Sequence, residues 1–355
     1  PQEPAIAGYP ETLAKYIEPR HKNWFAYSLS LPEAQAAVAN VLTERRGMPF
    51  EPDDVALTNG AFAGLNVSLH LLAGQGDEVI FVSPPWFFYE TMIAATGATP
   101  VRVKMDAETF DLDIDAIDAA ITPRTRAIIV NTPHNPSGRV FDEAEMGLIA
   151  DLCQEHDVIA VTDEIYEFMT YDGRRHITLA SLPGMWERTI TISGFSKTFS
   201  VTGWRLGYAV APPPLTEPLR NVHDFLTVCA PAPLQMAMLA ALALPPSYEA
   251  ELLTAYTGRR AAFLAILERN GFDPVVPEGA YYTMAGYSRL GDEEPRQFVE
   301  RMAREARVVA VPVSAFYRPG HGGNYVRFAF CKSPETMAET DRRLQALRAA
   351  VRSRT

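Results

Sequence analysis

One lysine stands apart in the middle of this chain. Lys197 is the lone lysine between Lys104 and Lys332, and small and aromatic residues surround it (SGFSKTFSVTGWR) at the end of a short apolar run. A lysine in such surroundings is not expected to be a free surface residue. Eight residues later, Arg205 provides a fixed positive charge that suits a phosphate group. The segment therefore predicts a lysine held next to an anion-binding position.

Polar or aromatic residues also follow other apolar runs. The sequence DEIY (163–166) follows one run, NTPHNPSG (131–138) a second and SPPWFFY (83–89) a third, and TNGAFAG (58–64) leads into a helical pattern. Open α/β sheets bind their ligands beyond the carboxyl ends of the strands. We therefore expect these segments and Lys197 to gather at one edge of a sheet, around one ligand.

The pattern of apolar residues predicts the elements that position these segments. Short apolar or alternating runs, typical of strands, occur at 79–82, 101–104, 127–130, 158–161, 189–192 and 207–211. Helical patterns occur at 33–46, 61–73 and 143–155. Strands that alternate with helices indicate an α/β fold with a mainly parallel sheet flanked by helices.

The pattern changes after about residue 211, where three prolines interrupt it. Long helical stretches at 232–244 and 247–269 precede a smaller α+β region, with runs at 281–286, 295–306, 308–312, 325–330 and 334–352. A length of 355 residues suits two domains. We expect a large domain at 47–245 and a small domain that combines 1–46 with 246–355.

The composition argues against several classes of protein. A net charge of −11 disfavours a nucleic-acid partner, because affinity for the phosphate backbone rests on clustered lysine and arginine. No run approaches the roughly 20 apolar residues of a membrane span, and the N-terminus does not resemble a signal peptide. The three cysteines (Cys153, Cys229 and Cys331) are too widely spaced for a disulfide framework or a paired-cysteine metal site. We expect a cytoplasmic protein without a metal ion.

The segment around Lys197 resembles the lysine signature of the class I/II aminotransferases, which are pyridoxal-phosphate (PLP) enzymes of fold type I. The order and spacing of the other segments fit the same family from about residue 33 onward. The resemblance implies that Lys197 holds the cofactor as a Schiff base and later moves a proton, and that Arg205 binds the cofactor phosphate. Relatives often carry a phosphate-binding serine three residues before the lysine. This chain has Gly194 there, and Ser193 and Ser196 are the alternatives.

The resemblance assigns roles to residues at three further strand ends. Asp163 is the carboxylate that keeps the cofactor's ring nitrogen protonated, which the ring requires to act as an electron sink. Tyr166 and Asn135 donate hydrogen bonds to its phenolic oxygen, and Trp86 stacks on the ring. His134, next to Asn135, is expected to be incidental.

The cofactor phosphate is expected at the start of a helix. The Gly-rich turn at 58–64 offers free N–H groups and the positive end of a helix dipole. The resemblance puts Gly60, Ala61 and Phe62 at the phosphate, mostly through the backbone.

Substrate contacts are expected from distant parts of the chain. Arg327 lies among apolar residues in the strand-like run YVRFAF (325–330), and a buried guanidinium needs a partner such as a substrate carboxylate. The family resemblance assigns Arg327 to the α-carboxylate of the amino acid. It also places Tyr281 and Gly8 near the substrate.

The resemblance further implies a homodimer with its sites at the subunit interface. Relatives carry a tyrosine that reaches the partner subunit's phosphate, seven residues before the proline of a helix start. Counting back from Pro32 gives Phe25, with Trp24 and Tyr27 nearby.

The predicted function is the transfer of an amino group between an L-amino acid and a 2-oxo acid. The same fold supports elimination at Cα and Cβ, as in a C–S lyase, and the motifs do not separate the two reactions. A PLP-binding regulator without catalysis is a third interpretation, although the chain has no basic segment for a DNA-binding module. The aromatic residues of the predicted site (Trp86, Phe87, Phe88 and Tyr281) suggest an aromatic or apolar substrate, and no second arginine stands out to bind a distal carboxylate.

Overall fold

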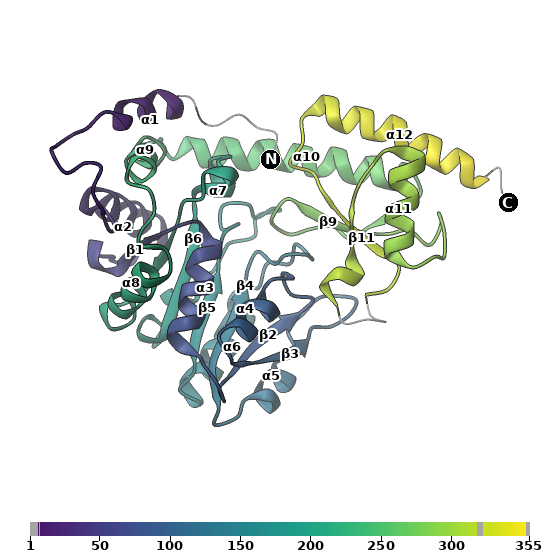
Figure 1. Ribbon diagram of the computed structural model, residues 1–355. Helices are drawn as coiled ribbons and strands as arrows, with labels where there is room; N and C mark the ends of the chain where they lie inside the picture. The colour runs from purple at the N-terminus through teal and green to yellow at the C-terminus, as the bar shows by residue number, and fades with distance from the viewer. Residues whose placement is uncertain (1–5, 7, 318–321, 353–355) are drawn as a thin grey trace.

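The computed structural model describes residue 6, residues 8–317 and residues 322–352. In this part of the chain, a seven-stranded sheet and a four-stranded sheet lie side by side with helices around them (Figure 1). The architecture is the α/β fold that the sequence predicts, with a large, mainly parallel sheet and a smaller α+β part.

The large sheet has the strand order β1-β7-β6-β5-β4-β2-β3. Its strands run parallel from β6 to β3, whereas β7 is antiparallel to both β6 and β1. The strands are β1 (Val55–Thr58), β2 (Glu78–Ser83), β3 (Thr99–Lys104), β4 (Thr125–Asn131), β5 (Ile159–Asp163), β6 (Thr189–Gly194) and β7 (Gly207–Val210). The carboxyl ends of β4, β5 and β6 therefore meet at one edge of the sheet.

The small sheet is antiparallel, with the order β10-β11-β9-β8. Its strands are β8 (Asp273–Pro274), β9 (Tyr282–Gly286), β10 (Val311–Pro312) and β11 (Tyr325–Ala329). The predicted strand at 308–312 is thus only two residues long.

The helices cover both sheets. The α-helices are α1 (Tyr9–Ile17), α2 (Pro32–Arg46), α3 (Ala61–Leu72), α4 (Tyr89–Ala95), α5 (Ile114–Ala120), α6 (Glu143–Glu155), α7 (Phe195–Thr198), α8 (Pro213–Thr227), α9 (Ala232–Leu242), α10 (Ser247–Arg269), α11 (Pro295–Ala306) and α12 (Pro334–Arg352). The short 3₁₀ helices are η1 (Pro52–Asp54), η2 (Leu179–Ser181), η3 (Trp186–Arg188), η4 (Thr202–Trp204) and η5 (Val313–Phe316).

Strand β2 shows why the inner strands have continuous apolar sequences. Ile80 and Val82 pack in a cluster with residues of α5 and α6, whereas Val79 and Phe81 pack in another with residues of α3 and α4. Successive side chains of a strand point to opposite faces of the sheet. Because helices bury both faces, the four positions 79–82 of the strand are all apolar.

Helix α8 begins at the three prolines that were expected to interrupt the pattern. Pro212 is its N-cap, and Pro213 and Pro214 are its first helical residues. Proline is tolerated in the first turn because the N–H groups there have no partner within the helix. The prolines therefore start a helix on the large sheet.

The N-terminal helices pack against the large sheet. We expected residues 1–46 to join the C-terminal region, but Val38 and Leu42 of α2 lie in an apolar cluster with Val55 of β1 and Phe195 of α7. The small-sheet cluster contains no described residue from this segment. The apolar face of α2 is therefore covered at the β1 side of the large sheet. Tyr248 of α10 packs against the same cluster, and Arg45 pairs with Glu249, so the grouping of 1–46 with 246–355 stays a prediction. The domain limits at 47 and 245 stay a prediction.

The segment after β5 connects the two sheets. Tyr166, Met169 and Tyr171 pack in the same apolar cluster as Tyr256 and Phe263 of α10. Helix α10 runs along the top of the molecule, from the large sheet to the small one (Figure 1). A segment that starts at a strand end of the large sheet is thus held by the core of the small sheet.

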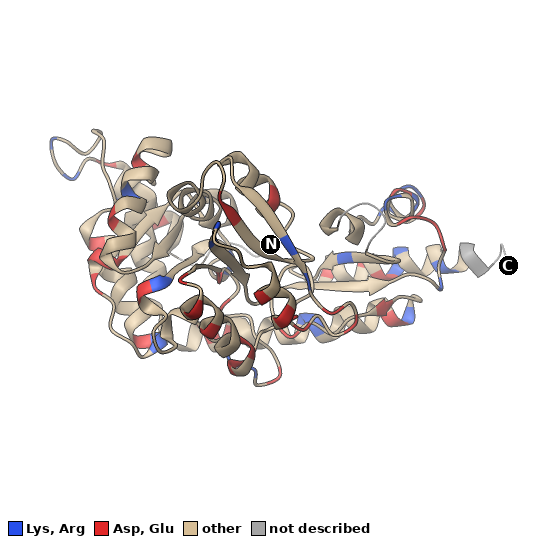
Figure 2. Cartoon of the chain, turned by 90° about the horizontal axis from the view of Figure 1, so that it is seen from below, with Lys and Arg blue, Asp and Glu red and all other residues tan. Residues whose placement is uncertain are grey.

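Acidic and basic residues are interspersed along the helices on the outside of the molecule (Figure 2). None of the helices that the structure describes combines the length and the apolar character required to cross a bilayer.

A buried ionic cluster lies behind the carboxyl ends of β5 and β6. Arg46 of α2, whose side chain is 6% exposed, contacts Glu167 at 2.8 Å and Glu164 at 3.2 Å. Glu164 also contacts His176, and Glu167 accepts a hydrogen bond from Ser193. Although burial opposes ionisation, Arg46 and His176 lower the pKa of Glu164 to about 2. The arginine thus stabilises two buried carboxylates.

We expect the substitution Arg46→Met to lower the free energy of unfolding by about 3–5 kcal/mol, because it leaves buried carboxylates without their cation. Urea denaturation followed by circular dichroism measures this change. Arg45→Met is the matched control: Arg45 is 22% exposed and pairs with Glu249, so its loss should cost about 1 kcal/mol or less. Equal effects of the two substitutions would contradict the role given to Arg46.

Candidate active site

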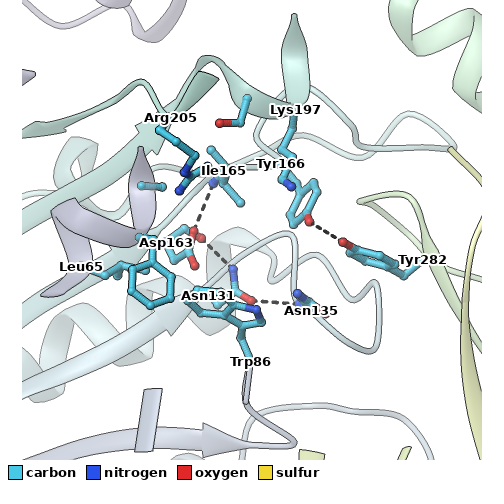
Figure 3. A pocket seen from close by; sticks show the side chains of 13 residues that line it. Leu65, Trp86, Asn131, Asn135, Asp163, Ile165, Tyr166, Lys197, Arg205 and Tyr282 are labelled. Carbon is cyan, nitrogen blue, oxygen red and sulfur yellow. Dashed lines mark hydrogen bonds between the residues drawn. The ribbon is translucent and has the colours of Figure 1, made fainter. Parts of the chain in front are cut away.

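A cavity of about 170 Å³ lies at the carboxyl ends of β4, β5 and β6. Side chains from separate elements point into it (Figure 3). The lining residues are Ala61, Phe62, Leu65, Trp86, Asn131, Asn135, Asp163, Ile165, Tyr166, Ser196, Lys197, Arg205 and Tyr282. The structure therefore brings together all but one of the predicted cofactor-binding residues around this cavity, and the remaining one, Gly60, directly precedes Ala61.

Asp163 lies at the end of β5, where it is buried. The Tyr89 hydroxyl donates a hydrogen bond to its Oδ2 atom at 2.6 Å, and the Asn131 side chain donates to its backbone carbonyl at 2.8 Å. Burial raises the pKa of Asp163 to about 6, against the hydrogen bond from Tyr89 and the charge of Lys197, which both lower it. Because burial disfavours the charge of this carboxylate, a cationic partner in the cavity would stabilise it.

Lys197 lies in α7, the single helical turn that follows β6. Burial lowers the pKa of its ammonium group, and the nearby charge of Arg205 acts in the same direction. The Nζ atom is 5.9 Å from the ring centre of Tyr166 and 5.7 Å from that of Tyr281. A desolvated lysine with a lowered pKa is suited to act as a nucleophile and a base.

Two positive groups meet at one end of the cavity. Helix α3 starts after Gly60 without a side-chain cap, and the guanidinium of Arg205 lies against this turn. Gly60 has a φ of 80°, and a Cβ atom there would lie only 2.6 Å from Arg205 Nη2, so a side chain at this position would strain the backbone and displace the guanidinium. No acidic residue in the described part of the chain forms an ion pair with Arg205. A helix N-terminus beside an arginine is suited to bind a phosphate.

One of the two serines considered from the sequence lines the cavity. Ser196 lines the cavity, whereas the Ser193 hydroxyl points away from it and donates to Glu167 at 2.6 Å. Gly194 has no room for a side chain, because an added Cβ would lie 2.8 Å from the Cα of Gly207. Of the two serines considered from the sequence, the geometry favours Ser196.

Trp86 and Asn135 lie on the side of the cavity opposite Arg205 (Figure 3). The backbone N–H of Asn135 donates to Asn131 Oδ1 at 2.9 Å, and the Asn135 side chain accepts a hydrogen bond from Arg327 at 2.5 Å. Asn135 thus connects the large sheet to β11 of the small sheet.

Arg327 is held between two aromatic rings. Its Cζ atom is 4.0 Å from the ring centre of Tyr282 and 4.9 Å from that of Phe316. Its Nε atom is buried and has no hydrogen-bond partner in the described part of the chain. A guanidinium with an unused donor beside the cavity fits the predicted role in binding a carboxylate.

Two residues expected near the substrate are absent from the wall of this cavity. Tyr281 is buried in contact with the rings of Tyr166 and Tyr256, 5.7 Å from Lys197 Nζ, and its neighbour Tyr282 lines the cavity. Gly8 is the exposed N-cap of α1 and does not line the cavity. Consecutive side chains at the start of β9 point in opposite directions, so Tyr282 and not Tyr281 points into the cavity.

His134 is a structural residue, as the sequence suggested. It is buried, its Nδ1 atom lies 2.7 Å from the Ser137 hydroxyl, and burial lowers its pKa to about 3. The imidazole is therefore neutral, and it is absent from the cavity wall.

Three residues of the site, Tyr89, Asn131 and Tyr282, have no role predicted from the sequence. Asn131 could have been found, because it ends β4 in register with Asp163 at the end of β5. Tyr89 and Tyr282 carry no local signal, since each makes its contact with a distant segment.

Comparisons with known proteins agree with this arrangement. The family model described as aminotransferase class I and II matches residues 19–344. The chain is 34% identical to human kynurenine–oxoglutarate transaminase 1 over 356 residues, which covers 91% of this chain and 84% of the relative.

Solved structures are similar over the whole fold. The N-succinyldiaminopimelate aminotransferase from Mycobacterium tuberculosis superimposes with a TM-score of 0.93 at 33% identity, covering 98% of this chain and 91% of that one. The aromatic aminotransferase from Pyrococcus horikoshii OT3 gives a TM-score of 0.89 at 32% identity, covering 100% and 94%.

We expect Gly194→Ser to destabilise the protein by about 1–3 kcal/mol, because its side chain would overlap the backbone of Gly207. Chemical denaturation measures the change. Gly203→Ser is the control, since no atom lies within 4 Å of a Cβ added there, and it should alter stability by about 0.5 kcal/mol or less. A Gly194→Ser protein as stable as the control would show that position 194 has room for a side chain.

Proposed function

The chain belongs to the aminotransferase class I and II family, and from this premise we propose that it uses Lys197 and PLP to transfer amino groups between an amino acid and a 2-oxo acid. The observation that carries the proposal is the cavity in which Lys197, Asp163 and Arg205 meet. The relatives compared above are all named as transaminases or aminotransferases, which favours transamination over elimination.

The cavity fits PLP at both of its ends. Arg205, Ser196 and the uncapped start of α3 are suited to the phosphate, because they combine a fixed positive charge with free donors. The buried Asp163 is suited to the protonated ring nitrogen, because a carboxylate favours the charged form of a neighbouring base. Trp86 lines the cavity and is suited to contact the aromatic ring of the cofactor.

When bound, PLP supplies an electron sink that stabilises negative charge at the substrate's Cα atom. Lys197 binds the cofactor and, once released from it, moves a proton at that carbon. Tyr166 and Asn135 hold the phenolic oxygen, and Arg327 orients the substrate through its α-carboxylate. Burial lowers the pKa of Lys197 and so favours its unprotonated amine, the form that acts as a base.

We propose an amino donor with an aromatic or bulky apolar side chain. Phe62, Trp86 and Phe88 form mutual ring contacts of 5.0–5.6 Å at the cavity, and Phe87 continues them to Phe316. This aromatic wall reaches the residue that packs on Arg327. Burial of an apolar side chain against it is favourable, whereas a second carboxylate would lose its hydration there.

Nearby Arg102 is committed to structural contacts. Its guanidinium pairs with Glu90 at 2.5 Å and donates to the backbone carbonyl of Phe316 at 3.1 Å. An arginine with these partners is poorly suited to bind a distal carboxylate of the substrate. This supports an amino donor with an apolar side chain.

We also propose a homodimer. Phe25, Tyr27 and Phe225 are 80–91% exposed, and the Ser28 hydroxyl lies 3.7 Å from Cys229 Sγ, so the segments around 25–28 and 225–229 are neighbours. Together they form an exposed aromatic surface that a second copy would bury. Trp24 is buried and donates to the Tyr16 carbonyl, which leaves Phe25 and Tyr27 as residues able to reach a partner.

A cytoplasmic location is part of the same proposal. Cys153, Cys229 and Cys331 are free thiols, and Cys153 and Cys331 are buried. Reduced cysteines are typical of a reducing compartment.

We expect Lys197→Ala to abolish the visible absorption band that PLP gives in the wild-type protein, because the covalent link to the chain is lost. Borohydride reduction followed by peptide mass spectrometry should locate the cofactor on Lys197 in the wild-type protein. Lys104→Ala, which alters an exposed lysine on β3, should retain the band. Cofactor fixed by borohydride to the Lys197→Ala protein would refute the assignment.

With 2-oxoglutarate as acceptor, we expect kcat/KM for phenylalanine to exceed that for aspartate by at least about tenfold, since burying an aromatic ring is worth about 1.5–3 kcal/mol. Phe62→Ala should lower kcat/KM for phenylalanine by roughly tenfold. The same variant assayed with alanine, which is too short to reach the wall, should change by about twofold or less. A preference for aspartate would overturn the proposed substrate class.

A further inference from the structure

Tyr282 occupies the junction between the two halves of the site. It begins β9 of the small sheet, is partly buried and lines the cavity next to residues of the large sheet. Its hydroxyl contacts Tyr166, and its ring contacts Arg327. The two contacts can be tested separately.

The hydroxyl of Tyr282 faces the cofactor side of the cavity. Tyr166 donates a hydrogen bond from its hydroxyl to that of Tyr282 at 3.0 Å (Figure 3). A hydroxyl has one donor and two acceptor positions. When Tyr166 donates its proton to a bound cofactor, its hydrogen bond with Tyr282 reverses, so that Tyr282 donates and Tyr166 accepts. Each bond of such a chain strengthens the next.

The ring of Tyr282 faces the substrate side. Arg327 pairs with Met284 across β9 and β11, and Tyr282 pairs with Ala329, so Tyr282 and Arg327 are diagonal neighbours on one face of the sheet. The guanidinium lies 4.0 Å from the ring centre. At this distance the ring attracts the cation and limits its rotation.

We propose that Tyr282 is a positioning residue that couples the substrate-binding and cofactor-binding sides of the site. Its ring orients Arg327 toward the α-carboxylate, and its hydroxyl orients Tyr166 toward the phenolic oxygen of the cofactor. The inference rests on the proposed PLP-dependent function and deepens it. Because Tyr282 belongs to the small sheet and Tyr166 to the loop after β5, the same contacts also connect the two halves of the molecule at the cavity.

The two tasks can be separated by substitution. Tyr282→Phe removes the hydroxyl and keeps the ring, whereas Tyr282→Leu removes both. If Tyr282 had a merely structural role, both substitutions would lower the stability of the protein. They would not change the spectrum in one variant and the KM values in the other.

The hydroxyl is tested without substrate, by titrating the visible spectrum of the protein loaded with PLP. A hydrogen bond donated to the phenolic oxygen favours the deprotonated form of the Lys197–cofactor adduct and so lowers the midpoint of the titration. Without the hydrogen bond from the Tyr282 hydroxyl, the bond that Tyr166 donates to the phenolic oxygen is weaker. We expect Tyr282→Phe to raise the midpoint by roughly 0.5 pH unit, the scale of one ordinary hydrogen bond.

The ring is tested by steady-state kinetics with the amino donor and the 2-oxo acid varied in turn. Tyr282→Phe should keep both KM values within about twofold of the wild type. Tyr282→Leu should raise both about tenfold, because both substrates carry the carboxylate that Arg327 holds and a desolvated cation–π contact is worth roughly that factor. The substitution should change kcat less than KM.

Tyr325→Phe is the matched control, since it removes a hydroxyl from a partly exposed tyrosine on β11 of the same sheet. It should alter neither the midpoint nor the KM values. A wild-type midpoint in Tyr282→Phe together with wild-type KM values in Tyr282→Leu would overturn the inference. Failure of the wild-type protein itself to bind PLP or to transaminate would instead refute the proposed function, so the two failures are distinguishable.

Discussion

The burial of opposite charges at the ends of β5 and β6 is the constraint on which the rest of the site depends. Asp163 and Lys197 are both removed from water. Burial raises the pKa of Asp163 and lowers that of Lys197, so it favours the neutral form of each group. Such groups are costly in a core unless neighbours stabilise them. The fold supplies these neighbours, since Tyr89 and Asn131 bind the segment of Asp163 and the cavity leaves room for a ligand that completes the charge balance.

The turn after β5 divides its side chains between two environments. Asp163 and Tyr166 line the cavity, whereas Glu164 and Glu167 point away from it to Arg46. The ionic cluster therefore anchors the turn from behind while the cavity side stays free for chemistry. Because Ser193 of β6 joins the same cluster, the segments that carry Asp163 and Lys197 share one support.

The cavity is completed by the small sheet. Arg327 and Tyr282 come from β11 and β9, and they contact Asn135 and Tyr166, which follow strands of the large sheet. The proposed substrate-binding and cofactor-binding sides are thus joined through side chains, while the apolar cluster around Tyr171 and α10 holds the backbone of the two halves together. Specificity for the amino donor would arise at this boundary, where the aromatic wall reaches Phe316.

The sequence by itself determined most of the elements and many of the residues that line the cavity, because strands, helices and strand-end residues follow local rules. Apolar runs mark the strands, and the carboxyl ends of parallel strands meet at one edge, so Lys197, Asp163 and Asn135 could be grouped in advance. Only the tertiary structure decided the position of the N-terminal helices, the choice of Ser196 over Ser193, and the roles of Tyr89 and Tyr282. These two tyrosines contact residues 74 and 116 positions away in the sequence. The direction of a hydroxyl group depends on how distant elements pack, and no local pattern of residues encodes it.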